Sequence, residues 1–227
     1  MLRIYFVTII VVIVLVVAYV YALVYFSSKP ADLAGVDMRN VFHERKTIPV
    51  VVQKEILTAL SHYPELKDTP IDFVFDPNTS KSIMLSQPVL SSFFRGRLKR
   101  SYVIKINPRF KLVHRVIPIQ DVPKNVLVGW FGHELGHVMD YRSHSNLEMI
   151  GFGIRYISSD KYIMRAEQHA DAYAIDHGLG DYIVSTKNFI LTNSEIPPEY
   201  RARIQRLYPS PQQVIDLVKK LKKHEVN

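Results

Sequence analysis

The longest apolar segment of the chain lies at its amino-terminal end. Residues Ile4–Phe26 form 23 consecutive positions without a charged side chain. As an α-helix this segment would extend about 34 Å, enough to cross the roughly 30 Å hydrocarbon core of a bilayer. It also exceeds the apolar region of a cleaved signal peptide, which is about 7–15 residues long. The pattern therefore predicts a transmembrane anchor within residues 1–28 and a single-pass membrane location.

The polar residues 29–46 predict a juxtamembrane linker, and residues 47–227 predict one folded domain. Apolar periodicity over Val50–His62 predicts a helix, and alternation over Thr69–Asp76 and Ser101–Asn107 predicts two strands. Because the segment "FFRGRLKR" before the second strand is typical of a turn, we expect a small antiparallel sheet.

The second half of the domain has the apolar period of helices. One helix is predicted to begin with Pro123 in its first turn. A second is expected over Asp160–His177, before Gly178, and a last one begins with Ser210 as N-cap and Pro211 at its first position. The expected fold class is α+β, with a mainly helical carboxy-terminal half.

The segment "GWFGHELGHVMDY" carries the most specific chemistry in the chain. His133 and His137 are four residues apart, so on a helix both imidazoles lie on one face and reach one metal ion. Glu134 lies beside that face, where it can take a proton from a metal-bound water. Gly132 and Gly136 each cost about 1 kcal/mol relative to Ala in a helix, which predicts that another backbone or a substrate approaches closely.

A catalytic zinc ion requires a third protein ligand and one open position. The segment "RAEQHADAYA" presents Glu167 and Asp171 on one helix face. One of these carboxylates can bind the ion while the other accepts the outer ring N–H of a ligating histidine. His169 is an alternative third ligand because zinc also accepts three histidines. Asp140 either orients a ligand or faces solvent.

The two motifs together, HELGH followed by E-x-x-A-D-x-x-A, resemble the gluzincin class of zinc metallopeptidases. The resemblance implies a zincin-like domain with His133, His137 and Glu167 as zinc ligands. It also implies Glu134 as general base and Asp171 as the hydrogen-bond partner of a ligating histidine. The 29 residues between His137 and Glu167 are more than in thermolysin-like enzymes, and one apparent membrane span departs from the multi-spanning members. The subfamily is therefore left open.

Two further features of the proposed site have several candidates. A group that stabilises the oxyanion could be Tyr156, Tyr162, Tyr173 or Arg165, and the sequence does not choose between them. The strand over Ser101–Asn107 either holds an extended substrate by edge pairing or is an ordinary internal strand.

Charge and cysteine content narrow the range of partners. The chain has a formal net charge of +8 and no cysteine, which excludes disulfides and cysteine-based zinc sites. Its basic residues are dispersed and accompany no nucleic-acid-binding motif, so we expect no nucleic acid. With a membrane anchor, the charge suits the anionic headgroups of a lipid bilayer.

Together these features predict a membrane-anchored zinc metalloendopeptidase whose catalytic domain faces the extracytoplasmic side. Zinc would activate a water that attacks a peptide bond of a peptide or protein substrate, with Glu134 as general base. The alternative is a catalytically silent, membrane-tethered binding protein whose zinc is structural or lost. The intact Glu134 argues against that alternative. The oligomeric state is left open.

Overall fold

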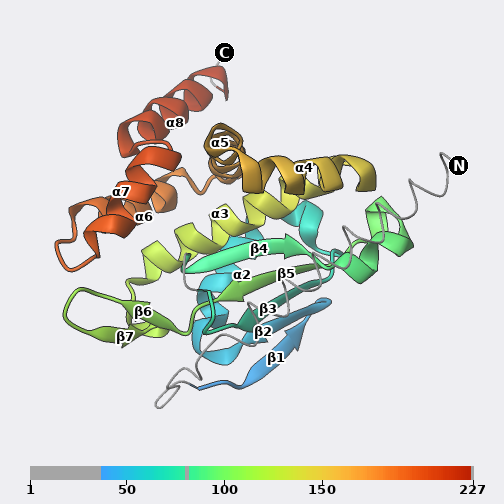
Figure 1. The fold of residues 1–227 in the computed structure, drawn as a ribbon, viewed down its shortest axis with the longest axis horizontal. Coiled ribbons are helices and arrows are strands. Elements are labelled where there is room, and N and C mark those ends of the chain that lie inside the picture. Colours follow the sequence, from blue (N-terminus) through green and yellow to red (C-terminus); the bar gives the residue numbers. More distant parts are fainter. Residues whose placement is uncertain (1–36, 80–81, 226–227) are drawn as a thin grey trace, which may run out of the picture. The chain divides into compact units, whose positions relative to one another are not determined.

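A five-stranded sheet and a set of helices make up residues 37–79 and 82–225, the residues that the computed structural model describes (Figure 1). The sheet consists of β1 (Asn40–His43), β2 (Lys46–Pro49), β3 (Ile71–Phe75), β4 (Met84–Pro88) and β5 (Tyr102–Ile106). The helices are α2 (Gln53–Ser61), α3 (Lys124–Ser143), α4 (Asn146–Ser158), α5 (Asp160–Asp176), α6 (Gly180–Thr192), α7 (Pro198–Leu207) and α8 (Pro211–Glu225). The expected α+β class with a mainly helical carboxy-terminal half is confirmed.

Short elements connect these parts of the fold. A two-stranded ribbon of β6 (Arg109–Lys111) and β7 (Val116–Pro118) leads towards α3. Single-turn or short 3₁₀ helices are η1 (Val50–Val52), η2 (Pro64–Leu66), η3 (Leu90–Arg95), η4 (Arg97–Lys99) and η5 (Ile119–Asp121).

The sheet is mixed, which corrects the expectation of an antiparallel one. Its strand order is β1-β2-β3-β5-β4, and β3 pairs with β5 in parallel, with Ile71 opposite Tyr102. The antiparallel neighbour of β5 is β4, a strand that was not predicted from the sequence. Alternation of apolar and polar residues predicts a strand, but it does not indicate whether the neighbouring strand is parallel or antiparallel. Because β5 lies between β3 and β4, the segment Ser101–Asn107 is an internal strand, and β4 is one of the two edge strands of the sheet.

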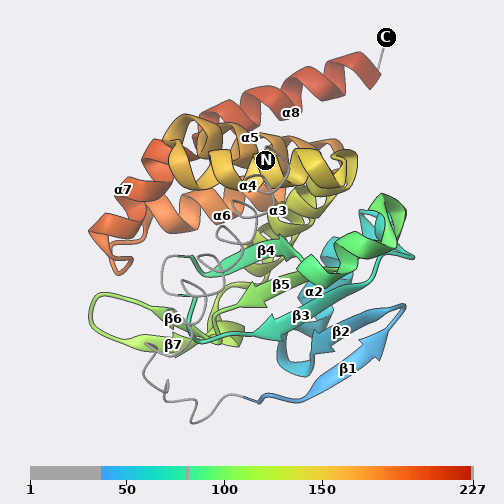
Figure 2. The same cartoon turned by 45° about the vertical axis from the view of Figure 1, so that its right-hand side comes forward.

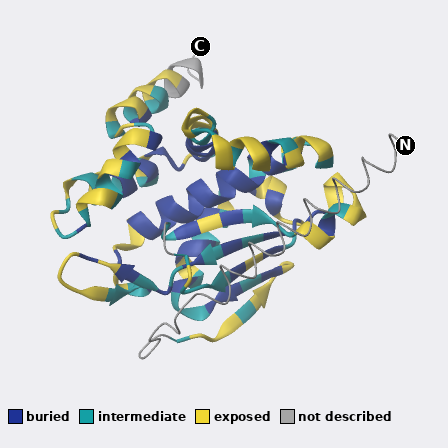
Figure 3. Cartoon of the chain, in the orientation of Figure 1, coloured by how far each residue is buried: buried dark blue, intermediate teal, exposed yellow. Residues whose placement is uncertain are grey.

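Helix α3 is the centre of the core. It contacts α2, α5, α6 and β4, and Figures 1 and 2 show it between the sheet and the remaining carboxy-terminal helices. Figure 3 shows that it is buried along most of its length. Phe131 packs edge-to-face on Phe73 of β3, with ring centroids 6.1 Å apart. A helix covered on all sides cannot show a polar stripe, and α3 has none.

The carboxy-terminal end of α3 is held by a buried arginine. Arg100 donates hydrogen bonds to the carbonyl oxygens of Tyr141 and His144, at 3.0 and 2.6 Å. These bonds connect the last turn of α3 and the residue after it to the segment that precedes β5. The next helix, α4, begins at once with a capping box formed by Ser145 and Glu148.

The glycines of α3 allow the close approach that the sequence predicts. A side chain at Gly136 would collide with the backbone carbonyl of Ala170 on α5. At Gly132 the close neighbour is the side chain of Leu179, with its Cδ1 2.6 Å from where a Cβ would lie. The contact at Gly136 joins two backbones, so α3 and α5 can cross closely only if position 136 has no side chain.

Several helix predictions agree with the structure, whereas the predicted linker does not. The helix expected over Asp160–His177 is α5, and the last helix begins at Pro211 as expected. The region 29–46, expected to be irregular, contains β1, which pairs with β2 through Val41 opposite Ile48. Its side chains do not alternate clearly, because β1 is an edge strand with mostly exposed residues.

The predicted membrane location requires correction. Within residues 37–79 and 82–225, no helix combines the length and the apolar character needed to cross a bilayer. The longest of these helices, α3, has 20 residues but carries the ionisable residues Glu134, Asp140 and Arg142, which are costly in a hydrocarbon environment. The segment Ile4–Phe26, on which the prediction rested, lies outside the described residues.

Replacing Gly136 by alanine should weaken the crossing of α3 and α5. We expect Gly136→Ala to lower the free energy of unfolding by about 1–3 kcal/mol, the usual cost of overpacking a core. The matched control is Gly153→Ala on α4, where a Cβ would have no neighbour within 4 Å. That variant should be neutral or stabilising by up to about 1 kcal/mol. Urea unfolding measures both, and a stabilised Gly136→Ala protein would contradict the backbone contact.

Candidate metal centre

Helices α3 and α5 bring together one group of side chains that could hold a metal ion: His133, His137 and Glu167. Their candidate ligand atoms lie within 4.8 Å of one another, and all three residues are buried. Nε2 of His133 and Nε2 of His137 lie 2.9 and 3.3 Å from the same oxygen of Glu167, Oε2. When three ligand atoms bind the same tetrahedral zinc ion at the usual bond length, the distance between any two of these atoms is roughly 3.3 Å. The spacing and chemistry of these donors therefore fit such an ion.

The ring of His133 is oriented by a second carboxylate on α5. Its Nδ1 lies 2.9 Å from Oδ1 of Asp171. Because a carboxylate accepts a hydrogen bond, Nδ1 carries the proton and Nε2 faces Glu167. For His137, Nδ1 has no hydrogen-bond partner among the described residues, and the ring instead stacks on Tyr141 at a centroid distance of 5.9 Å.

The carboxylates determine the charge of the centre. Burial alone would lower the pKa of His133, but hydrogen bonds to Asp171 and Glu167 raise that pKa to about 10. Burial raises the pKa of Glu167, but His137 and His133 hold it well below its usual value. The pKa of Asp171 is likewise lowered, because Lys187 and His133 outweigh the effect of burial. In the metal-free protein, the imidazole ring of His133 is therefore positively charged and lies between two ionised carboxylates, those of Glu167 and Asp171.

Glu134 lies on α3 beside the metal group and is buried. The hydroxyl of Ser86 on β4 donates to Oε2 of Glu134, at 2.6 Å, and lies 2.9 Å from the Glu134 carbonyl oxygen. This edge strand thus fixes one oxygen of the predicted general base. Ser86 was not among the predicted site residues because β4 was not predicted, although the buried positions Met84 and Ser86 alternate with more exposed ones.

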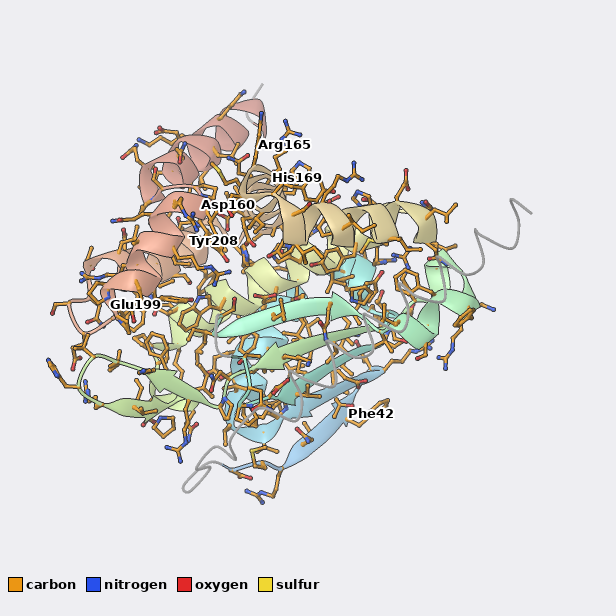
Figure 4. All side chains as sticks on the ribbon, in the orientation of Figure 1. Phe42, Asp160, Arg165, His169, Glu199 and Tyr208 are labelled. Carbon is orange, nitrogen blue, oxygen red and sulfur yellow. The ribbon has the colours of Figure 1, made fainter. Side chains whose placement is uncertain are left out.

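Of the four candidates for stabilising an oxyanion, the structure brings Tyr156 to the metal group. Its hydroxyl donates to Oε1 of Glu167, at 3.0 Å. Burial and Glu167 raise the pKa of Tyr156, so its hydroxyl stays protonated. Arg165 is exposed on α5 (Figure 4). Tyr162 contacts Phe152, and the ring of Tyr173 lies beside that of His177.

A cleft adjoins His133 and Glu134 and receives walls from α6 and α7. The cleft is narrow, with a volume of about 40 Å³. Its apolar lining includes Met84, Trp130, Ile183, Ile190 and Ile204. Tyr208, labelled in Figure 4, also lines it, and its ring lies 5.8 Å from that of His133. The cleft wall from α6 and α7 was not predicted, since no local sequence pattern links the region after Ile190 to α3.

The alternative ligand His169 lies elsewhere. Its side chain is 64% exposed on α5 (Figure 4), with Nδ1 3.5 Å from Oδ1 of Asp140. Asp140 is buried, so it does not face solvent. The neighbour of its carboxylate is His169, which is not a member of the metal group. The residues that the structure brings together are thus those predicted, with Glu167 and not His169 as the third member of the metal group.

No protein-family model, curated protein or solved structure matches the chain. The roles of the individual residues and the resemblance to gluzincins remain predictions. The geometry itself supports the coarser statement that His133, His137 and Glu167 could hold a metal ion.

Metal binding should release protons and tighten as the pH rises. With a pKa of about 10, His133 is protonated on Nε2 at neutral pH, so an ion must displace that proton. Between about pH 6.5 and pH 8.5 we expect the affinity of the metal-free protein for Zn²⁺ to rise by up to tenfold per pH unit. Competition with a chromophoric chelator measures this slope. A pH-independent affinity would contradict the protonated state of His133.

Proposed function

We propose that the protein is a zinc-dependent metallopeptidase of the gluzincin type, with His133, His137 and Glu167 as zinc ligands and Glu134 as general base. The observation that supports this most is the position of Glu134. It is buried, held by Ser86, and lines a cleft together with His133. A metal site with a purely structural role needs neither a carboxylate base nor a cleft beside the ligands.

The residues of the chain divide the chemistry between them. When bound, zinc would supply Lewis acidity and lower the pKa of a water to about 7. Glu134 would take a proton from that water and pass it to the amine of the departing product, while the hydroxyl is added to the carbonyl carbon. Since the hydroxyl of Ser86 donates to Oε2 of Glu134, we assign the proton transfer to the other carboxylate oxygen of Glu134, Oε1. Tyr156 holds Glu167 in place through Oε1 of that residue.

An extended peptide is the substrate class that suits the surroundings of Glu134. Within the described part of the chain, β4 pairs only with β5. Its other edge therefore offers backbone groups to an added strand, apart from the carbonyl oxygen of Ser86, which accepts from the hydroxyl of Tyr141. The cleft beside it has apolar walls that include Trp130 and Ile183, which favour an apolar side chain next to the cleaved bond.

Replacing the proposed base should separate metal binding from catalysis. We expect Glu134→Gln to retain one zinc ion per chain and to lower peptide hydrolysis by at least about 10²-fold, because the amide cannot accept the proton. Metal analysis and cleavage of a peptide library, with and without a chelator, measure the two properties. The control is His169→Ala, which lies outside the metal group and should change neither.

An unchanged rate in Glu134→Gln would refute the assigned base. One zinc ion per wild-type chain with no hydrolysis of any peptide would favour the rival function, a catalytically silent binding protein.

The third ligand can be tested independently of turnover. Glu167→Ala removes the carboxylate that both histidine Nε2 atoms approach, so we expect zinc content well below one ion per chain after dialysis. Circular dichroism would check that the helices persist. If the variant still holds one zinc ion per chain, Glu167 is not the third ligand.

A further inference from the structure

Lys187 of α6 is a buried lysine to which the proposed chemistry assigns no role. It is 4% exposed. Its ammonium nitrogen forms an ion pair with Oδ2 of Asp171, at 2.7 Å. The same nitrogen lies 5.3 Å from the centroid of the Tyr208 ring. Burying an ammonium group is strongly unfavourable unless its charge is paired, so its location depends on Asp171.

The ion pair continues into the metal group through the two oxygens of one carboxylate. Oδ2 of Asp171 contacts Lys187, whereas Oδ1 contacts Nδ1 of His133 at 2.9 Å. Three helices therefore meet at Asp171, with α5 supplying the carboxylate, α3 the imidazole and α6 the ammonium group. Contacts at both oxygens restrict rotation of the carboxylate and keep Oδ1 directed at His133.

The other buried lysine of the described residues makes contacts of a different kind. Lys46 donates to the backbone carbonyl oxygens of Glu44 and Lys67, at 2.9 and 2.7 Å. Those bonds join two loops and involve no residue of the metal group. Lys187 instead contacts a side chain that itself contacts a proposed zinc ligand.

We propose that Lys187 is a positioning residue of the metal centre, which acts through Asp171 to hold the His133 ring with Nε2 towards Glu167. This inference rests on the proposed function, since His133 must bind a metal ion for its orientation to matter. Outer contacts of ligating histidines commonly change metal affinity by roughly 10- to 100-fold when removed. Lys187 does not contact His133 directly but contacts Asp171, which contacts His133. The positive charge of Lys187 offsets the negative charge of Asp171.

The test is Lys187→Met, which keeps an unbranched apolar stem and removes the charge. We expect the affinity for Zn²⁺ to fall by roughly 10-fold or more, measured by competition with a chromophoric chelator. The visible absorption spectrum of the Co²⁺-loaded protein should also change, because the His133 ring is no longer held. With zinc saturating, kcat should fall while KM changes little. The control Lys105→Met breaks an ion pair of similar length, 2.9 Å from Asp76, whose side chains are more exposed, and should leave metal affinity unchanged.

A double-variant cycle shows whether Lys187 acts through Asp171. Asp171→Asn should weaken Zn²⁺ binding by itself, and adding Lys187→Met to it should cause little further loss. Fully additive losses would overturn the proposal. The double variant lacks both the carboxylate of Asp171 and the ammonium group of Lys187, so neither charge is left unpaired. If Lys187→Met alone does not fold, the zinc affinities of the double variant and of Asp171→Asn are compared to test the positioning role.

Failure of this inference can be told apart from failure of the proposed function, because zinc affinity requires no turnover. Weaker Zn²⁺ binding by Lys187→Met in a protein that cleaves no peptide would support the positioning role and refute the peptidase. Unchanged Zn²⁺ affinity and Co²⁺ spectrum in an active protein would overturn the positioning role alone.

Discussion

The candidate metal centre depends on the close crossing of α3 and α5. His133 and His137 occupy one face of α3, and Glu167 and Asp171 occupy one face of α5. Neither helix has all the donors of the centre, so these side chains meet only because the two backbones approach closely at Gly136 and Ala170. Metal–ligand bonds tolerate deviations of only a few tenths of an ångström. A contact between two backbones, which cannot yield as a flexible side chain can, gives the crossing the required rigidity.

The same crossing explains why polar groups are tolerated in the core. Helix α3 lies between the sheet and several helices, an environment in which an unpaired polar side chain is strongly destabilising. Its polar side chains at the site have specific partners, since His133 contacts Asp171 and Glu167, and Glu134 contacts Ser86. The partners come from three separate elements, α5, β4 and, through Asp171, α6. The centre is thus a buried polar network inside an apolar core, and its geometry is determined by packing.

Local patterns were sufficient to predict some of this network and not the rest. The four-residue spacings in α3 and α5 identify the faces that carry His133, His137, Glu167 and Asp171, because helical period determines which residues share a face. The contributions of Ser86 and Lys187 could not be predicted, since a single serine or lysine has no local signature and its partner is chosen by tertiary packing. The direction of β3 relative to β5 was wrong for a related reason, because alternation along one strand contains no information about its neighbour.

The charges of the centre favour a cation at the place where the proposed ligands meet. Asp171 contacts both Lys187 and His133, whereas Glu167 contacts two imidazoles and a tyrosine hydroxyl. The raised pKa of His133, about 10, is the response of the metal-free protein to this excess of negative charge. A proton on Nε2 then supplies part of the positive charge that a divalent ion would supply in full. Because the charge of Lys187 already offsets that of Asp171, the charge of Glu167 is left to attract a cation between the two imidazoles.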